Sequence, residues 1–230
     1  MRIPVARGLE DSLHHTARVL PQAFYARDAL LVAEALLGKL LCRGEVLLRI
    51  TEVEAYCHPD DTASHCRMGL TPRNAPMWGP PGHAYVYLCY GMHQMLNLVT
   101  NATGEGAAVL IRACEPVAGH ALIEARRGGL RGPALLTGPG KVGAALALDA
   151  SLSGAPLFAR DGLCVLDAPA PGGILRGPRV GIGYASPAHQ AVAWRFAVAG
   201  SAWVTQRKSL QLVATNGVTR PRSRKRSRPS

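Results

Sequence analysis

The chain has 230 residues, of which 48% are hydrophobic and 18% charged, a composition that suits one folded domain and excludes disorder over most of its length. No apolar stretch approaches the roughly 18 residues of a membrane-spanning helix, and the first residues lack the apolar segment of a secretory signal. We therefore expect a cytoplasmic protein that does not contact a membrane. Lys and Arg exceed Asp and Glu by 11, and six of these basic residues lie in residues 220–230, which favours a polyanion such as nucleic acid as partner.

The six cysteines are not spaced as CxxC, and several lie in apolar runs. This pattern favours reduced thiols over a disulfide framework. Cys57, His58, His65 and Cys66 could hold zinc, but ligands adjacent in sequence fit a tetrahedral site poorly. We therefore predict no metal and no other cofactor, with zinc as the alternative.

Residues 1–20 are polar and are predicted to be a flexible N-terminal arm, followed by one domain over 21–210 and a basic, disordered tail over 211–230. Within the domain, Asp28 is a suitable N-cap for a helix that Gly38 ends. In chain order the patterns then predict a strand over 46–56, a long loop over 57–83, strands over 85–90, 94–100 and 107–114, helices within 118–129 and 137–148, and strands around 179–183 and 194–200. The strands between 85 and 114 are expected to form a meander.

Two acidic residues interrupt the apolar pattern of the strand over 46–56. Positions 46, 48 and 50 are apolar, and Glu52 and Glu54 continue the same two-residue period, so we expect them on the same face. A partly desolvated carboxylate takes up a proton more readily than an exposed one, so Glu54 is a candidate general base. Alternatively, Glu54 pairs with a buried arginine such as Arg112, and Glu52 could equally be the structural residue.

Aromatic residues occupy distinct positions around the next strand. Tyr85 and Tyr87 share one face and are predicted to lie in the core, whereas Tyr90 falls beside Gly91 at the tip of a predicted hairpin. A bulky ring at an exposed tip is well placed to act as a wedge that enters a duplex where a base is missing. His65, in the long loop, is either a surface histidine or one that stacks on a purine and donates to it.

Six segments carry a family likeness: TEVEAYCHPDDTASHC, TPRNAPMWGPPGHAYVYLCYGMHQMLNLVT, AAVLIRACEP, TGPGKVGAALAL, PRVGIG and GSAWVT. Together and in this order they resemble the alkyladenine (3-methyladenine) DNA glycosylase family, from about Leu20 to about Thr205. The resemblance implies a single α+β domain with a curved antiparallel β-sheet, surrounding short helices and long loops. It also implies binding of double-stranded DNA in the minor groove.

The activity implied by the resemblance is that of a monofunctional DNA N-glycosylase of base excision repair. Such an enzyme flips an alkylated or deaminated purine out of duplex DNA and hydrolyses its N-glycosidic bond, leaving an abasic site. The implied partner is double-stranded DNA that contains damaged purines, and we expect a monomer to bind it. The expected location is the nucleoid in the cytoplasm of a bacterium, or the nucleus of a eukaryote.

The resemblance further implies roles for individual residues. Glu54 looks like the glutamate that activates the attacking water, Arg112 like the arginine beside it, and Tyr90 like the tyrosine that fills the gap in the base stack. The remaining candidates are the pocket residues Tyr56, His65, Tyr87 and Asn97, and the minor-groove flank Met92 and His93. Among the pocket residues, His65 would donate to the Watson–Crick edge and Asn97 would disfavour the amine of normal guanine.

Two other functions use the same residues. A metal-dependent nuclease could use Glu52, Glu54, Asp60 and Asp61 as oxygen ligands for magnesium. A non-catalytic nucleic-acid-binding protein could use the aromatic residues as stacking platforms. The first would need chelatable metal for strand cleavage, and the second would not depend on Glu54.

Overall fold

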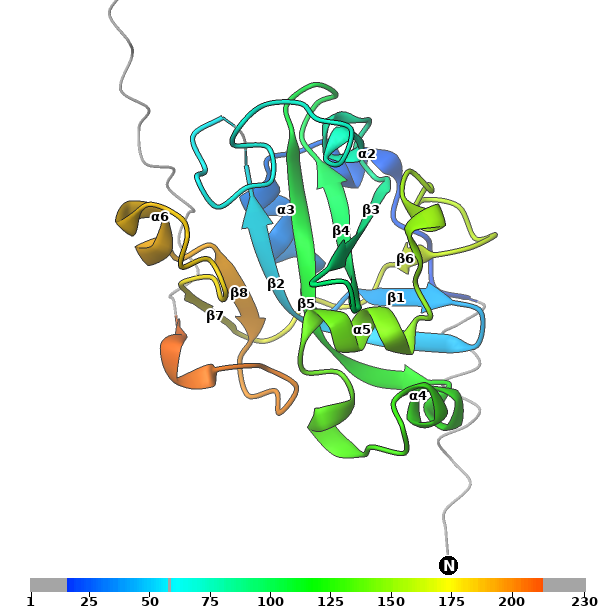
Figure 1. Cartoon of the computed structure of the whole chain (residues 1–230). Helices are drawn as coiled ribbons and strands as arrows, with labels where there is room; N and C mark the ends of the chain where they lie inside the picture. The colour runs from blue at the N-terminus through cyan, green and yellow to red at the C-terminus, as the bar shows by residue number, and fades with distance from the viewer. Residues whose placement is uncertain (1–15, 58, 213–230) are drawn as a thin grey trace, which may run out of the picture.

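The computed structural model describes residues 16–57 and 59–212, which form one antiparallel sheet with short helices around it (Figure 1). The sheet has nine strands in the order β3-β4-β5-β2-β8-β7-β9, with β1 paired to both β2 and β6. The strands are β1 (Leu40–Arg43), β2 (Val46–Tyr56), β3 (Ala84–Cys89), β4 (His93–Thr100), β5 (Ala107–Ala118), β6 (Cys164–Leu166), β7 (Ile174–Gly177), β8 (Arg195–Val198) and β9 (Gln211–Leu212). The predicted α+β class is confirmed.

The helices are short in a chain that contains 25 glycines and 17 prolines, both of which disfavour helix interiors. They are α2 (Gln22–Tyr25), α3 (Ala29–Leu36), α4 (His120–Arg126), α5 (Pro139–Ala145) and α6 (Pro187–Ala191), with 3-10 turns η1 (Ala75–Trp78), η2 (Gly132–Leu135), η3 (Ala150–Leu152) and η4 (Arg207–Ser209). The predicted cap of α3 is confirmed, because the Asp28 side chain accepts from the Leu30 N–H. Gly38 follows with a φ of 83°, where an added Cβ would lie 2.7 Å from the Pro169 carbonyl oxygen.

The main core contains apolar residues of β2, β4 and β5 together with residues of α3 and α5. In Figure 1, α3 lies behind β2, and α5 crosses the lower end of β4 and β5. Gly143 permits the close approach of α5 to β4, because an added Cβ would lie 2.1 Å from the Gln94 carbonyl oxygen. Packing of this kind fixes β4 and β5, which carry several candidate site residues.

The alternation of β2 changes in the middle of the strand. Its pairing with β5 shifts register between Ile50 and Val53, and neither Thr51 nor Arg112 has a partner in the ladder. Apolar residues at 46, 48 and 50 face the main core before the shift, and those at 53 and 55 face it afterwards. The expectation that Glu52 and Glu54 share a face with the apolar row is therefore wrong, since a bulge moves the following side chains to the other face.

After the shift, one row of side chains crosses the sheet on the face opposite the main core. The register places Tyr85 opposite Asn97, Asn97 opposite Leu110, Leu110 opposite Glu54, and Glu54 opposite Arg195. Residues directly opposite each other in antiparallel strands point to the same side. The sheet thus brings Glu54 onto the face that carries Asn97 and Tyr85.

The remaining predictions for the domain have mixed outcomes. The meander is confirmed as β3-β4-β5, although β5 continues past Cys114 to Ala118. The predicted strand around 179–183 is wrong, because these residues form the loop that follows β7. Most of the predicted N-terminal arm, residues 1–15, and most of the tail, residues 213–230, lie outside the described residues. No helix in the described part of the chain is long and apolar enough to cross a membrane.

Candidate active site

A cavity of about 550 Å³ lies beside this row of side chains, within the size range of small-ligand sites. It brings together six residues that the sequence nominates: Tyr56, His65, Tyr87, Tyr90, Asn97 and Arg112. Its other lining residues are Arg73, Met77, Cys89, Met95, Leu110, Pro139, Val180, Gly181, Ile182 and Tyr184. The cavity is thus largely aromatic and apolar, with a few polar groups.

Glu54 is fully buried and is not itself among the residues that line the cavity, but it bonds to residues that do. Its Oε2 accepts a hydrogen bond of 2.8 Å from the Tyr56 hydroxyl, and its Oε1 accepts one of 2.7 Å from the Val180 N–H. Arg112 Nη1 lies 3.3 Å from Oε1. These three partners all line the cavity. A carboxylate offers about four acceptor positions, so its oxygens retain capacity for one further donor such as water.

Glu52 occupies a different environment and is held on all sides. Its Oε1 accepts from Arg112 Nε at 3.0 Å, from Arg195 Nη1 at 3.2 Å and from the Thr205 hydroxyl at 2.6 Å, while Oε2 accepts from the Thr205 N–H at 2.5 Å. Burial alone would lower the pKa of Arg112, but the negative charges of Glu54 and Glu52 together raise it. Glu52 therefore orients Arg112, and Arg112 bridges the two glutamates.

Three rings pack against one another at one side of the cavity. Tyr85 and Tyr87 are stacked with centroids 5.4 Å apart, and His65 meets Tyr87 edge-on at 4.6 Å. His65 Nδ1 lies 3.0 Å from the Tyr85 hydroxyl. Burial, followed by the charges of Arg73 and Arg67, lowers the pKa of His65, so the ring is neutral at neutral pH. The prediction that Tyr85 lies in the core is confirmed, whereas Tyr87 lines the cavity.

The hydroxyls of Tyr56 and Tyr85 keep their protons. Burial raises the pKa of Tyr85 to about 12, and burial together with the charge of Glu54 raises the pKa of Tyr56 well above its usual value. Tyr56 is therefore a hydrogen-bond donor to Glu54. Asn97 is buried, and its Nδ2 donates to the Tyr85 carbonyl at 3.2 Å, which fixes the amide at the cavity wall.

The hairpin between β3 and β4 ends in an exposed apolar tip. Tyr90 is 86% exposed and Met92 73% exposed. Tyr90 and Gly91 both have positive φ values, 50° and 68°, and the Met92 N–H donates to the Cys89 carbonyl, which defines a type I′ turn. A tyrosine in this conformation is strained, since such turns favour asparagine and glycine.

A second cleft lies on the other side of the hairpin. It has a volume of about 490 Å³, and its lining includes Met92, His93, Arg127 and Lys141. An added Cβ at Gly140 would lie 2.8 Å from the His93 side chain, so His93 packs directly on the start of α5. Met92 and His93 thus line a cleft whose lining includes neither Tyr90 nor Arg73.

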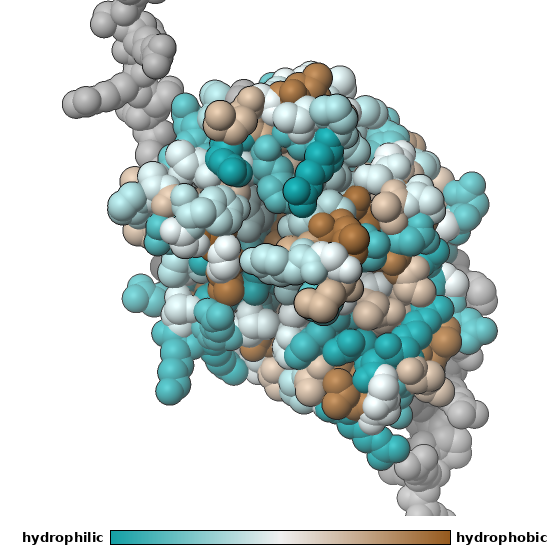
Figure 2. Space-filling view, viewed as in Figure 1, coloured by the Kyte–Doolittle hydropathy of each residue, from teal (hydrophilic) through white to brown (hydrophobic). Residues whose placement is uncertain are grey.

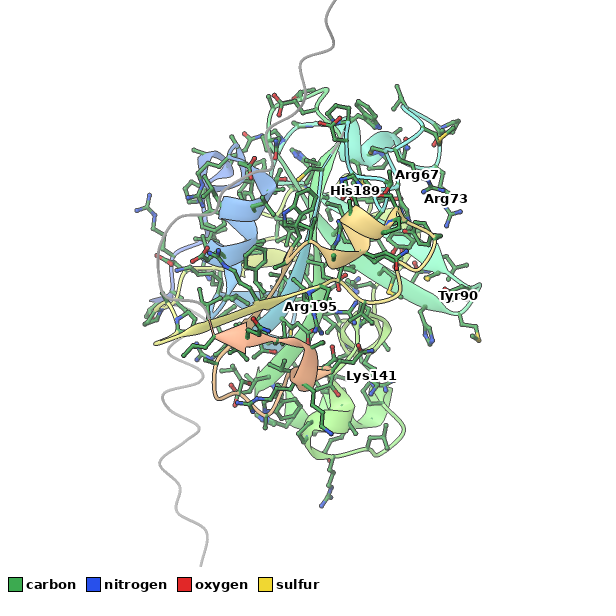
Figure 3. The ribbon with its side chains drawn as sticks, turned by 90° about the vertical axis from the view of Figure 1, so that its left-hand side faces the viewer. Arg67, Arg73, Tyr90, Lys141, His189 and Arg195 are labelled. Atoms are coloured by element: carbon green, nitrogen blue, oxygen red, sulfur yellow. The ribbon has the colours of Figure 1, made fainter. Side chains whose placement is uncertain are left out.

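Basic side chains surround the cavity and the tip. Figure 3 shows Arg67, Arg73, Tyr90 and Lys141 along one side of the molecule. Within the described ranges, no carboxylate lies within ion-pair distance of Arg67, Arg73 or Lys141. On the face that Figure 2 shows, hydrophobic and hydrophilic side chains are interleaved. A basic rim around exposed aromatic and apolar groups is typical of a nucleic-acid interface.

Some site residues were not predicted from the sequence. Val180 supplies a backbone N–H to Glu54, Tyr184 is a fourth tyrosine in the cavity lining, and Arg179 forms a buried ion pair with Asp61. The loop after β7 contains the segment PRVGIG, which is part of the family resemblance, but the sequence alone assigns no role to any residue in that segment. The described residues contain no group of three or more His, Cys, Asp or Glu that could hold a metal ion; His58, one of the four zinc candidates, is outside the described residues.

An aromatic cavity with a buried carboxylate, set in a basic face, defines an enzyme site suited to nucleic acid. Comparison with known proteins identifies the family. The sequence profile of methylpurine-DNA glycosylase matches residues 23–202. The chain is 59% identical over 193 residues to a putative 3-methyladenine DNA glycosylase of Nitrosococcus oceani, covering 84% of this chain and 96% of that protein. It is 52% identical over 212 residues to a DNA-3-methyladenine glycosylase of Arabidopsis thaliana, covering 90% and 80%.

The chain therefore belongs to the methylpurine-DNA glycosylase family, and the predicted resemblance is confirmed. It is a DNA repair glycosylase, a hydrolase that acts on N-glycosyl bonds, and its substrate is DNA. The roles of the individual site residues and the way in which the base reaches the cavity are developed below.

Proposed function

We propose that the protein flips a damaged purine into the 550 Å³ cavity and that Glu54 activates a water molecule for attack on the sugar. The observation that carries this proposal is the setting of Glu54. Its carboxylate is buried, is held by two hydrogen bonds and one ion pair from residues that line the cavity, and has capacity for a further hydrogen bond. A fixed carboxylate of this kind can accept a proton from water and place negative charge near an oxocarbenium-like sugar.

Tyr90 acts as the wedge in this proposal. Its exposure and its place at the tip of a rigid hairpin allow the ring to enter the base stack as the damaged nucleotide leaves. Met92 and His93 contact the minor groove beside it. The basic rim of Arg67, Arg73 and Lys141 attracts the DNA phosphates on both sides of the Tyr90 wedge.

The flipped base binds among the aromatic rings. Tyr56, Tyr87 and His65 supply faces and edges for stacking, which favours electron-poor, positively charged bases over normal ones. Asn97 disfavours the exocyclic amine of normal guanine. Arg112, oriented by Glu52, holds the water or the nucleotide backbone beside Glu54.

The site favours lesions that already have a good leaving group. An alkylated purine carries positive charge, so water activation is sufficient for its release. A neutral lesion such as hypoxanthine needs protonation, and His65 is mostly unprotonated at neutral pH because burial lowers its pKa. We therefore propose that positively charged alkylated purines are released faster than deaminated ones.

The contacts of the carboxylates argue against a metal-dependent nuclease. Glu52 is engaged by two arginines and Thr205, and Asp61 by Arg179, so neither presents free oxygen atoms to a cation. No lysine is among the described residues that line the cavity, so a Schiff-base lyase step has no nucleophile there. Hydrolysis that leaves an abasic site is the reaction that fits these side chains.

We further propose that the protein acts as a monomer on duplex DNA, at the nucleoid of a bacterial cytoplasm or in a nucleus. The direct test of the reaction is incubation with duplexes that contain methylated purines, ethenoadenine or hypoxanthine, with chelator present. Mass spectrometry should detect the free base, and the strand should break only after alkali. Strand cleavage that chelator abolishes would support a nuclease, and binding without base release would support a non-catalytic protein.

A further inference from the structure

Arg179 and Asp61 form a fully buried ion pair that takes no part in the chemistry described so far. Arg179 Nη1 lies 2.6 Å from Asp61 Oδ2, and Nη2 lies 2.7 Å from Oδ1, so the pair is bidentate. Both side chains are 0% exposed. The pair joins the loop after β2 to the loop after β7, which are far apart in the sequence.

Arg179 is linked to both of the neutral hydrogen-bond donors of Glu54. Its Nη1 donates to the carbonyl of Ala55, the residue after Glu54, at 2.9 Å. It also immediately precedes Val180, whose N–H donates to Glu54. Its guanidinium lies 4.6 Å from the centre of the Tyr56 ring, and the Tyr56 hydroxyl is the other neutral donor to Glu54. Both of these donors therefore depend on the position of Arg179.

Asp61, the partner of Arg179, also fixes the backbone of the loop after β2. Its Oδ2 accepts from the Cys57 N–H at 3.3 Å, and its Oδ1 accepts from the Ala63 N–H at 3.0 Å. These bonds hold the backbone in a turn directly after β2 and fix the position at which the segment that carries His65 begins. One ion pair thus ties the catalytic strand to a wall of the base cavity.

The stability of the fold alone does not explain such a pair. Burial of two charges carries a large desolvation cost, and apolar or neutral replacements of buried ion pairs are often as stable as the original. In addition, the buried Nε of Arg179 has no hydrogen-bond acceptor among the described residues. A pair of this kind is retained where it fixes geometry.

We propose that Arg179, held by Asp61, is a positioning residue for base excision. It keeps the Tyr56 hydroxyl and the Val180 N–H aimed at Glu54, so that the carboxylate holds one orientation toward the sugar. This inference rests on the proposed role of Glu54. Loss of the pair should therefore slow the chemical step and leave DNA binding nearly unchanged.

The test is the double substitution Arg179→Met with Asp61→Asn in the full chain. No unpaired charge remains, and the asparagine oxygen can still accept from the backbone at residues 57 or 63. We expect the single-turnover rate of base release to fall about 10- to 100-fold, because small misplacements of reacting groups have effects of this size. The Kd for lesion-containing duplex should stay within about threefold, and the melting temperature within a few degrees.

The matched control is Arg176→Met with Glu34→Gln. Arg176 is also ion-paired, to Glu34, and lies 5.2 Å from the Phe196 ring centre, but it does not contact the cavity. This variant should release base at the wild-type rate. An unchanged rate in the folded Arg179 and Asp61 variant would overturn the inference, as would a fall in rate fully explained by weaker DNA binding.

A third variant covers the case in which the double variant does not fold. Arg179→Lys keeps the charge but cannot form the bidentate pair, so we expect a folded protein with a reduced rate and unchanged Kd. A wild-type rate for Arg179→Lys would then contradict the inference. Glu54→Gln separates the role of Glu54 from the positioning role of Arg179. If Glu54→Gln still releases base, the proposed role of Glu54 fails. If Glu54→Gln is inactive but the Arg179 variants release base at the wild-type rate, only the positioning role fails.

Discussion

Replacement of Tyr90 by asparagine should make the protein more stable and less active. Tyr90 has a φ of 50° at the first central position of a type I′ turn, a conformation that costs an ordinary L-residue about 1–2 kcal/mol. Asparagine followed by glycine is the preferred pair for this turn. Tyr90 is 86% exposed, so the tyrosine surface that is shielded from water is only about 30 Å² and contributes at most about 0.7 kcal/mol.

The difference predicts a net stabilisation of about 0.3–1.3 kcal/mol, or a rise in Tm of about 1–5 °C. Loss of the stacking ring should meanwhile slow base release from duplex DNA about 5- to 150-fold, corresponding to about 1–3 kcal/mol of stacking. Thermal melting and single-turnover excision measure the two effects, and single-stranded lesion DNA is the control, since no gap in a duplex has to be filled. A lower Tm, or wild-type excision from duplex, would refute this reasoning.

Other features of the structure give further predictions. Glu52→Gln leaves two buried arginines without a full counter-charge and should lower the free energy of unfolding, measured by urea denaturation, by about 3–5 kcal/mol. The control Glu124→Gln, at a mostly exposed ion pair, should change the free energy of unfolding by less than about 1 kcal/mol. Because the pKa of His65 is lowered, its neutral form contributes stability that is present above the ordinary histidine pKa of about 6.5 and is lost as pH falls below that value. His65→Gln should remove this part of the pH dependence of stability. An unchanged plot of stability against pH would contradict the prediction. Deletion of residues 220–230 should reduce the slope of log Kd against log salt by up to about 5, and an identical slope would show that the tail does not contact phosphates.

Local chemistry in the sequence predicted a substantial part of the fold. The Asp28 cap, the whole of β2 and the hairpin tip at Tyr90 follow from short-range patterns, and each lies where the sequence indicated. The exposed tyrosine could be recognised because the turn residues Tyr90 and Gly91 leave no route for the ring into the core. These features need no information about distant parts of the chain.

Features that depend on long-range pairing could not be predicted in this way. The register shift at Thr51 and Arg112 arises between two strands that are remote in sequence, and it reverses the face of Glu54. The sequence predicts a strand around Val180, yet the Val180 N–H bonds to a buried carboxylate instead of to another strand. The ion pair of Asp61 and Arg179 likewise exists only because two loops meet.

The measurement that tests the central claim most directly is base release by Glu54→Gln. Glutamine is nearly isosteric, its amide oxygen can still accept from the Val180 N–H, and its NH2 group can donate to the Tyr56 hydroxyl oxygen, so the cavity should keep its shape. We predict that the variant binds a lesion-containing duplex with wild-type affinity and that its single-turnover rate falls by about 10²–10⁴, the usual contribution of a general base. A variant that binds normally and releases base at a rate near wild type would contradict the assignment of Glu54 as the residue that activates water.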